Sequence, residues 1–266
     1  MVIAERQLGL FGLIKEQQKA NKGYGFLTND QWALYGDKRR VEKYSSWNPL
    51  LDGYQENFDK VLNGVSLIDL VLRRKRPIAI DIMGPSDTLA DLAVTAKNKD
   101  KHKKILGIAI SYKDIRDKEK KSRDKALNIW QIEGDVMDNK TWKEVKSKLG
   151  GRKVDLIMER MGAGYSGIPR NPIFYGAMLV KIWKLLSNED GTFVGQVPPG
   201  FSIVINQAVD YLRNNNVDIL LEEDVVKIVK TKSSPEDIGP ILRTLKKPKQ
   251  EGDALDYMLA DFPFKI

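Results

Sequence analysis

The stretch Pro77-Ile-Ala-Ile-Asp81-Ile-Met-Gly84-Pro-Ser86 decides the fold that we predict for this chain. Four apolar residues around one carboxylate predict a buried strand over residues 78–82, and Gly84 then permits a tight turn. Ser86 and Asp87 are residue types that cap helices, and apolar residues recur at helical spacing directly after them. The stretch therefore predicts a strand, a turn and a helix, which begin a βαβ unit.

The same alternation continues as far as residue 197. Short apolar runs predict further strands at 105–110, 128–133, 154–158 and 192–197, with amphipathic segments between them. A sixth strand is expected within 218–231, and the tail that ends at residue 266 is a candidate for a last, antiparallel strand. We therefore predict an α/β, Rossmann-like fold with a mainly parallel seven-stranded sheet and helices on both of its faces.

Residues 1–72 lack a clear strand pattern. Their apolar residues fall at helical spacing, as in Tyr54 and Phe58, and the segment is rich in aromatic and turn residues. We therefore predict a helical N-terminal extension over 1–72 and an α/β domain over 73–266. The extension either forms a lid or substrate-recognition segment over the ligand crevice or packs on the domain as an arm, and both interpretations stay open.

The composition limits the chemistry and the location of the protein. The chain has no cysteine and a single histidine, His102, which lies in a lysine-rich run, so we predict no metal site built on these residues and no serine hydrolase triad, while a carboxylate-bound magnesium stays open. The apolar runs are too short to span a bilayer, and the first residues do not have the charge pattern of an export signal. We therefore expect a cytoplasmic protein that has no membrane partner.

The charge balance indicates an anionic partner. The net charge is +8, and the isoelectric point is near 9.3. The densest run of positive charge, Arg73-Arg74-Lys75-Arg76, has no neighbouring acid in the sequence and stands just before the first predicted strand. Contact with nucleic acid through this basic surface is one hypothesis, although the run is expected on the opposite side of the sheet from the ligand crevice.

The ends of the predicted strands, taken in order, resemble the class I S-adenosylmethionine-dependent methyltransferases. Asp81-Ile-Met-Gly84-Pro-Ser86 is similar to the family's glycine loop in a degenerate form with one glycine, and Gly107-Ile-Ala-Ile-Ser111 is similar to its second-strand segment. Gly134-Asp135-Val136 resembles the turn that contacts adenine, while 154–158 resembles the family's fourth strand and 185–194 its following helix and fifth strand. The resemblance covers roughly residues 76–198.

This resemblance implies a cofactor, S-adenosyl-L-methionine, and a set of residues that would contact it. The implied cofactor-binding residues are Asp81, Met83, Gly84, Pro85, Ser86, Ala109, Ser111, Gly134, Asp135, Val136 and Glu159. By the resemblance, Asp135 accepts a hydrogen bond from the adenine amino group and Val136 donates through its backbone. Ala109 stands where the family usually has an acid that holds the ribose hydroxyls, and Asp114 is the acid that could take its place.

The segment after the fourth strand bears on the methyl acceptor. It does not have the Asn/Asp-Pro-Pro-aromatic pattern of amino-group methyltransferases, and Gln196 stands where similar ribose methyltransferases carry a lysine. Glu159 is our candidate catalytic residue, with pairing to Arg160 or to another loop residue as its structural alternative, and Arg160 and Tyr165 are our candidate substrate contacts. The acceptor itself stays unassigned.

We therefore predict S-adenosyl-L-methionine-dependent methyl transfer to an undetermined acceptor. The alternative is a catalytically inactive module of the same fold that binds protein or nucleic acid, because a fold alone does not establish activity. A nicotinamide-dependent dehydrogenase is less consistent with the sequence, since the Gly-x-Gly-x-x-Gly fingerprint is missing.

Overall fold

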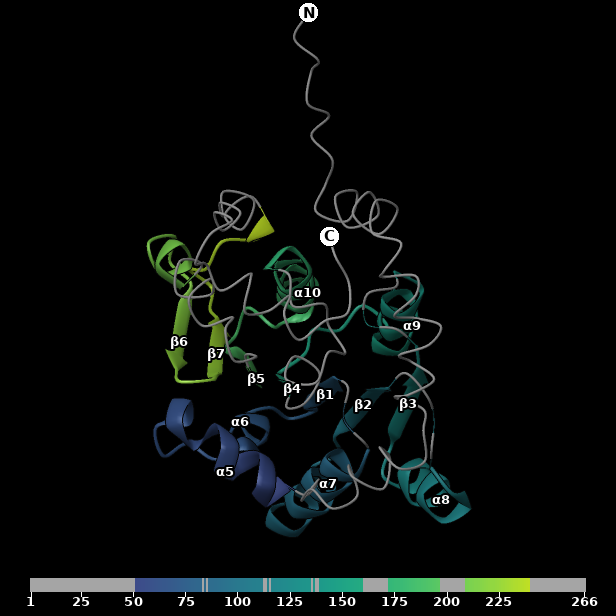
Figure 1. Cartoon of the computed structure of the whole chain (residues 1–266). Helices are drawn as coiled ribbons and strands as arrows, with labels where there is room; N and C mark the ends of the chain where they lie inside the picture. The colour runs from purple at the N-terminus through teal and green to yellow at the C-terminus, as the bar shows by residue number, and fades with distance from the viewer. Residues whose placement is uncertain are drawn as a thin grey trace, which may run out of the picture.

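The computed structural model describes residues 51–239, with gaps at 83, 85, 112–113, 115, 135, 137–138, 160–171 and 197–208. Within these residues a seven-stranded sheet forms the centre of the molecule, in the order β3-β2-β1-β4-β5-β7-β6 (Figure 1). The strands are β1 Ile78–Ile82, β2 Leu106–Ser111, β3 Ile129–Glu133, β4 Leu156–Glu159, β5 Gly191–Gln196, β6 Asp218–Glu222 and β7 Val225–Lys230.

The sheet is mixed rather than purely parallel. Strands β1 to β5 pair in parallel, whereas β7 is antiparallel to both of its neighbours, β5 and β6. The order 3-2-1-4-5 is that of a doubly wound Rossmann sheet, in which the strand order reverses beside the first strand. The predicted Rossmann-like α/β fold is therefore confirmed, and β7 is the one reversed strand among those described.

Helices cover both faces of the sheet (Figure 1). Their bounds are α5 Leu51–Leu62, α6 Leu67–Leu72, α7 Asp87–Lys99, α8 Lys118–Ala126, α9 Asn139–Leu149 and α10 Pro172–Leu185. Helices α9 and α10 lie on one face, and α5 to α8 lie on the other. None of these helices is long and apolar enough to cross a membrane.

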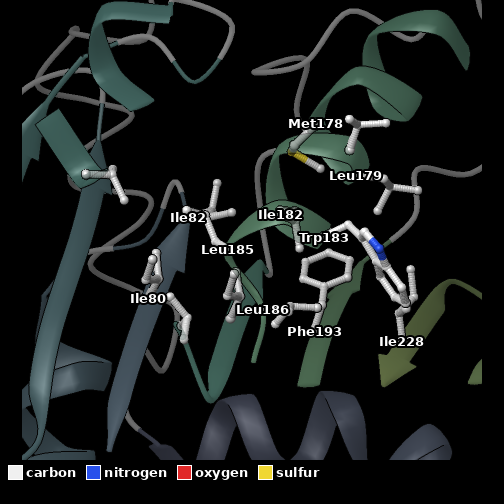
Figure 2. Close-up of a cluster of buried hydrophobic side chains, with 14 of the residues drawn as sticks. Ile80, Ile82, Met178, Leu179, Ile182, Trp183, Leu185, Leu186, Phe193 and Ile228 are labelled. Atoms are coloured by element: carbon white, nitrogen blue, oxygen red, sulfur yellow. The ribbon is translucent and has the colours of Figure 1, made fainter. Parts of the chain in front are cut away.

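The core on the α10 face is dominated by branched aliphatic and aromatic side chains. Ile80 and Ile82 of β1 and Phe193 of β5 project toward α10, where Ile182 and Trp183 meet them (Figure 2). Trp183 is almost completely buried, and its indole N–H donates to the carbonyl of Pro235 at 3.0 Å. The polar atom of this large side chain is thus satisfied inside the core.

Residues 51–72 form part of the core on the other face. Tyr54 and Phe58 are buried among side chains of the sheet and of α7, and their rings pack edge to face with centroids 5.8 Å apart. Helix α5 contacts α7 and the β6–β7 hairpin. It ends at Leu62 because Asn63 and Gly64 adopt positive φ angles of 52° and 78°. These residues pack on the domain, and the role of a lid stays a prediction.

The region 218–231 contains two strands where the sequence predicts one. Strands β6 and β7 form a hairpin whose turn is Glu223-Asp224, with Glu223 at a positive φ of 52°. Apolar residues on both sides of this short acidic turn merge into what looks like one long apolar segment. The reversed strand is therefore β7, ahead of the tail from which it was expected, and residues 240–266 lie outside the described part.

The basic run before β1 is also less uniform than its sequence indicates. Arg74 forms ion pairs with Glu189 at 2.7 Å and with Asp155 at 3.4 Å, which ties the entrance of β1 to the segments before β4 and β5. Asp155 accepts a further hydrogen bond from the backbone N–H of Ile78 at 2.9 Å, and burial raises the pKa of its carboxyl group. The run has no neighbouring acid in the sequence, but the fold brings two distant acids to Arg74.

The burial of α5 predicts that residues 51–72 fold together with the sheet. Replacing the fully buried Phe58 (Phe58→Ala) should lower the free energy of unfolding by about 3–5 kcal/mol, because the cavity is enclosed by the core. Urea denaturation measures this change, with the exposed Glu56→Ala in the same helix as the control. A loss below about 1 kcal/mol for Phe58→Ala would mean that α5 is detached from the cooperative core.

Candidate functional site

The carboxyl ends of β1 to β4 meet at one edge of the sheet. Ile82 lies opposite Ile110 of β2 and Glu159 of β4, and Ser111 lies opposite Glu133 of β3. The segments that leave these strands therefore start side by side, at the edge where sheets of this kind bind ligands. Of the predicted site residues, Met83, Pro85, Asp135, Arg160 and Tyr165 lie outside the described residues.

Asp81 is buried beneath this edge. Its side chain has no exposed surface, and the hydroxyl of Tyr54 donates to its two carboxylate oxygens at 3.0 and 3.2 Å. Because a buried carboxylate is costly unless hydrogen bonds compensate it, α5 contributes directly to the stability of this position. Sequence reasoning missed this role of Tyr54, whose only signal was a hydroxyl group within the apolar stripe of a helix.

Gly84 packs directly against the same carboxylate. A β-carbon at this position would lie 2.3 Å from one oxygen of Asp81 and 2.5 Å from the other. No larger residue fits unless Asp81 moves, so the turn after β1 is held onto the buried acid by the lack of a side chain. This contact explains the single glycine of the turn.

Helix α7 begins directly after this turn. Ser86 occupies the N-cap position, but its side chain makes no capping hydrogen bond, so the expected capping by its hydroxyl is not observed. Its hydroxyl instead accepts a long hydrogen bond of 3.4 Å from Arg123. Asp87, in the first helical turn, forms ion pairs of 2.8 Å with both Lys120 and Arg123 of α8.

A chain of ion pairs extends from α7 through α8 to the segment after β2. Asp124 is completely buried, and its carboxylate forms ion pairs with Arg123 at 2.7 Å and with Arg116 at 2.8 Å. Arg116 in turn holds Asp114 through two hydrogen bonds, of 2.9 Å from Nε and 3.0 Å from Nη2. The hydrogen bonds from Arg116 lower the pKa of Asp114 to about 2. The three carboxylates of this series of ion pairs, those of Asp87, Asp114 and Asp124, therefore each have a cationic partner.

This chain of ion pairs bears on the ribose contact. Ala109 lies opposite Asp81 in the pairing of β1 with β2 and is completely buried, so it offers only a methyl group. Asp114 is the acid that could substitute for it, but its carboxylate is already held in two hydrogen bonds by Arg116. A ribose contact by Asp114 would therefore have to compete with a bidentate ion pair.

The turn after β3 is held by the first residues of α9. The backbone N–H of Gly134 donates to the carbonyl of Ser111 at 2.9 Å, and the indole of Trp142 donates to the carbonyl of Val136 at 2.5 Å. A β-carbon on Gly134 would lie 2.4 Å from the hydroxyl oxygen of Thr141. Gly134 is thus held to β2 and Val136 to α9.

Glu159 ends β4 and is completely buried. It lies opposite Ile82 in the sheet, and side chains in register share a face, so Glu159 points to the α10 face. Asp81, one residue before Ile82, points to the α5 face. The two buried acids at this edge are therefore on opposite sides of the sheet, and this excludes a shared role as a carboxylate pair.

Comparisons with known proteins give only distant likenesses. No protein-family model and no curated protein matches the sequence. Among solved structures, the chain is similar to the MycE methyltransferase of the mycinamycin biosynthetic pathway, with 13% identity, a TM-score of 0.44 and 71% of this chain covered. The alignment spans 51% of the MycE chain, so this chain matches about half of its length.

Two further structures show a similar level of likeness. The 1,6-didemethyltoxoflavin-N1-methyltransferase of Burkholderia thailandensis, solved with S-adenosylhomocysteine, shares 13% identity, with 79% of this chain and 90% of that chain covered and a TM-score of 0.45. MnmC2 from Aquifex aeolicus shares 13% identity, with 78% and 75% covered and a TM-score of 0.46. At these TM-scores and identities the likenesses carry no argument about activity.

The hydrogen bond between Tyr54 and Asp81 predicts the effect of removing one hydroxyl group. Tyr54→Phe should lower the free energy of unfolding by roughly 1–3 kcal/mol, because a buried carboxyl group loses a donor. Chemical denaturation measures the loss, and Tyr211→Phe on an exposed tyrosine serves as the matched control. A double-mutant cycle with Asp81→Ala, which removes the acceptor, should show coupling between the two positions, and strictly additive losses would contradict the assigned contact.

The ion pair between Asp114 and Arg116 predicts part of the acid sensitivity of the protein. The pKa of Asp114 is about 2 in the folded state and ordinarily 3.8, so its contribution is complete above the ordinary value and is lost as the pH falls toward 2. At neutral pH this contribution is on the order of 1–2 kcal/mol. Stability curves between about pH 2 and pH 7 should therefore fall less steeply below pH 4 for Asp114→Asn than for the exposed-site control Asp218→Asn, and identical slopes would reject the assignment.

Proposed function

We propose that this chain is an S-adenosyl-L-methionine-dependent methyltransferase that holds its cofactor at the carboxyl edge of β1, β2 and β3. One observation carries the proposal. The segments 81–86, 107–111 and 134–136, which bear the sequence resemblance, come from three strands that are adjacent in the sheet and end at the same edge. This convergence at a strand-order reversal is what a site for a nucleotide-like ligand requires.

In this proposal the turn at 134–136 receives the adenine. The indole N–H of Trp142 donates to the carbonyl of Val136, so we assign the backbone N–H of Val136 to the contact with adenine. Asp135 is the proposed acceptor for the adenine amino group. The hydrogen bond from Trp142 holds Val136 to α9, which lowers the ordering cost of binding at this residue.

The turn at Gly84 borders the methionine part of the proposed site. S-adenosyl-L-methionine supplies a methyl group activated by a positively charged sulfonium. Asp81 lies directly under Gly84, so its carboxylate would place negative charge beneath this turn. Asp81 is covered by Tyr54 and Gly84, so we assign it a positioning role through the turn rather than direct contact.

On the acceptor side we assign Glu159, with Arg160 and Tyr165 as substrate contacts. Methyl transfer depends chiefly on holding the nucleophile in line with the methyl group, and it demands few acid or base groups. A single carboxylate that orients the acceptor is sufficient for this chemistry. Glu159 is on the opposite face of the sheet from Asp81, which suits separate roles for the two acids.

A second candidate function is a binding module of the same fold without catalysis. This function is favoured by the lack of a free acid at the two candidate ribose positions. Ala109 offers no carboxylate, and the carboxylate of Asp114 is held by Arg116. In this case the partner would be a protein or a nucleic acid on the basic surface, where Arg73, Lys75 and Arg76 are exposed. Cofactor binding separates the two functions.

Isothermal titration calorimetry with S-adenosyl-L-methionine and S-adenosylhomocysteine tests the proposed enzyme. We expect a Kd on the order of micromolar for the wild-type chain. Asp135→Ala should weaken binding by about tenfold to a hundredfold, because a charge-assisted hydrogen bond contributes roughly 1.5–3 kcal/mol.

Asp218→Ala is the matched control, since it removes the same charge from an exposed position on the edge strand β6 and should leave the affinity unchanged. The absence of binding at millimolar cofactor would reject the enzyme and leave the binding module. Equal losses for Asp135→Ala and Asp218→Ala would reject the assigned adenine contact.

A further inference from the structure

A pocket lies at the opposite edge of the sheet from the candidate cofactor site. It has a volume of about 720 Å³ and is bounded by the C-terminal ends of α9 and α10, by the turn that enters β4 and by the end of β7. Its cationic lining residues are Lys146, Arg152, Lys153, Lys184 and Lys230. Because Arg152 and Lys153 precede β4 whereas Glu159 ends it, the pocket is at the amino edge of the parallel strands.

Hydrogen bonds to the ends of the two helices hold three of these cations in place. Arg152 donates from Nε to the carbonyl of Leu149 at 3.1 Å. Lys153 donates to the carbonyl of Lys184 at 2.7 Å, and Lys230 donates to that of Trp183 at 3.0 Å. These bonds hold the three cationic groups beside the helix ends, Lys230 in a buried position and Arg152 and Lys153 in exposed ones, which lowers the entropic cost of binding an anion.

Capping of the helices accounts for only part of this charge. The C-terminal end of each helix is equivalent to about half a negative charge, so α9 and α10 together offset about one cation. The lining also contains two acids, Glu236 and Asp237, and the latter is 3.5 Å from Lys184. With five cationic residues in the lining, an excess of about two positive charges remains.

Burial strengthens the electrostatic effect of this excess positive charge. Lys230 is only 8% exposed, so water screens its charge poorly. Its pKa is lowered, first by burial and then by the nearby Lys153, while Glu236 and Asp237 act in the opposite direction. An anion seated between Lys153 and Lys230 would relieve their repulsion.

We propose that this pocket binds a small molecule that carries two or more phosphate groups. Its volume is within the range of small-molecule sites, and several fixed cations around one space suit a polyvalent anion better than a single carboxylate. The proposal does not depend on methyl transfer, because the pocket shares no residue with the candidate cofactor site.

Calorimetric titration of the full chain with sodium tripolyphosphate tests this proposal. The double variant Lys146→Gln/Lys153→Gln removes two pocket charges, and glutamine at 153 retains a donor for the end of α10. We expect its affinity to fall by at least about tenfold. The matched control Lys75→Gln/Lys104→Gln removes two charges from exposed positions before β1 and β2 and should change the affinity by less than about twofold.

Three results would overturn the proposal. They are no binding of tripolyphosphate at millimolar concentration, equal losses in the two double variants, and a larger loss of tripolyphosphate affinity in the control variant than in the pocket variant. The last result would assign the anion affinity to the surface before β1 and β2. If the pocket variant does not fold, Lys184→Gln, at the half-exposed rim, replaces it with the same expected direction of change.

Discussion

The arrangement of this fold around its candidate site depends on the burial of one carboxyl group, that of Asp81 in the central strand β1. Tyr54 reaches it from α5, and Gly84 folds the following turn against it. Burying an acid is costly, so both neighbours are constrained: the helix must supply a donor, and the turn must lack a β-carbon. One interaction therefore connects the segment before the sheet to the turn that opens the candidate site.

A second set of charges holds the same region from the outside. The ion pairs from Asp87 through Asp124 to Asp114 join the start of α7 to α8 and to the segment after β2. Because Asp124 is completely buried, removing either of its arginine partners would leave a poorly compensated charge in the core. The network thus stabilises the walls of the site while it occupies Asp114, the acid that a ribose contact would need.

The two edges of the sheet differ in electrostatic character. At the carboxyl edge the buried acids Asp81 and Glu159 lie on opposite faces, beside turns that glycine allows to pack closely. At the amino edge, lysine and arginine side chains cap the ends of α9 and α10 and leave an excess of positive charge around a pocket. Parallel strands place helix ends of opposite polarity at opposite edges, which is the physical origin of this division.

The sequence by itself determined the order of strands and helices through β5, because apolar runs and glycine turns are local signals, and β1 was predicted with its observed ends. It could not separate β6 from β7, since a short acidic turn between two apolar runs leaves the periodicity almost unbroken. It placed Asp81 and Gly84 at a strand end but gave no sign that Tyr54 donates to Asp81 or that Arg116 holds Asp114 in the folded structure. Those contacts join residues that are distant in sequence or whose side chains can turn in several directions. The free-energy cost of burying a charge arises only when the chain has folded around that charge. Tertiary packing therefore decides which of these partners is used.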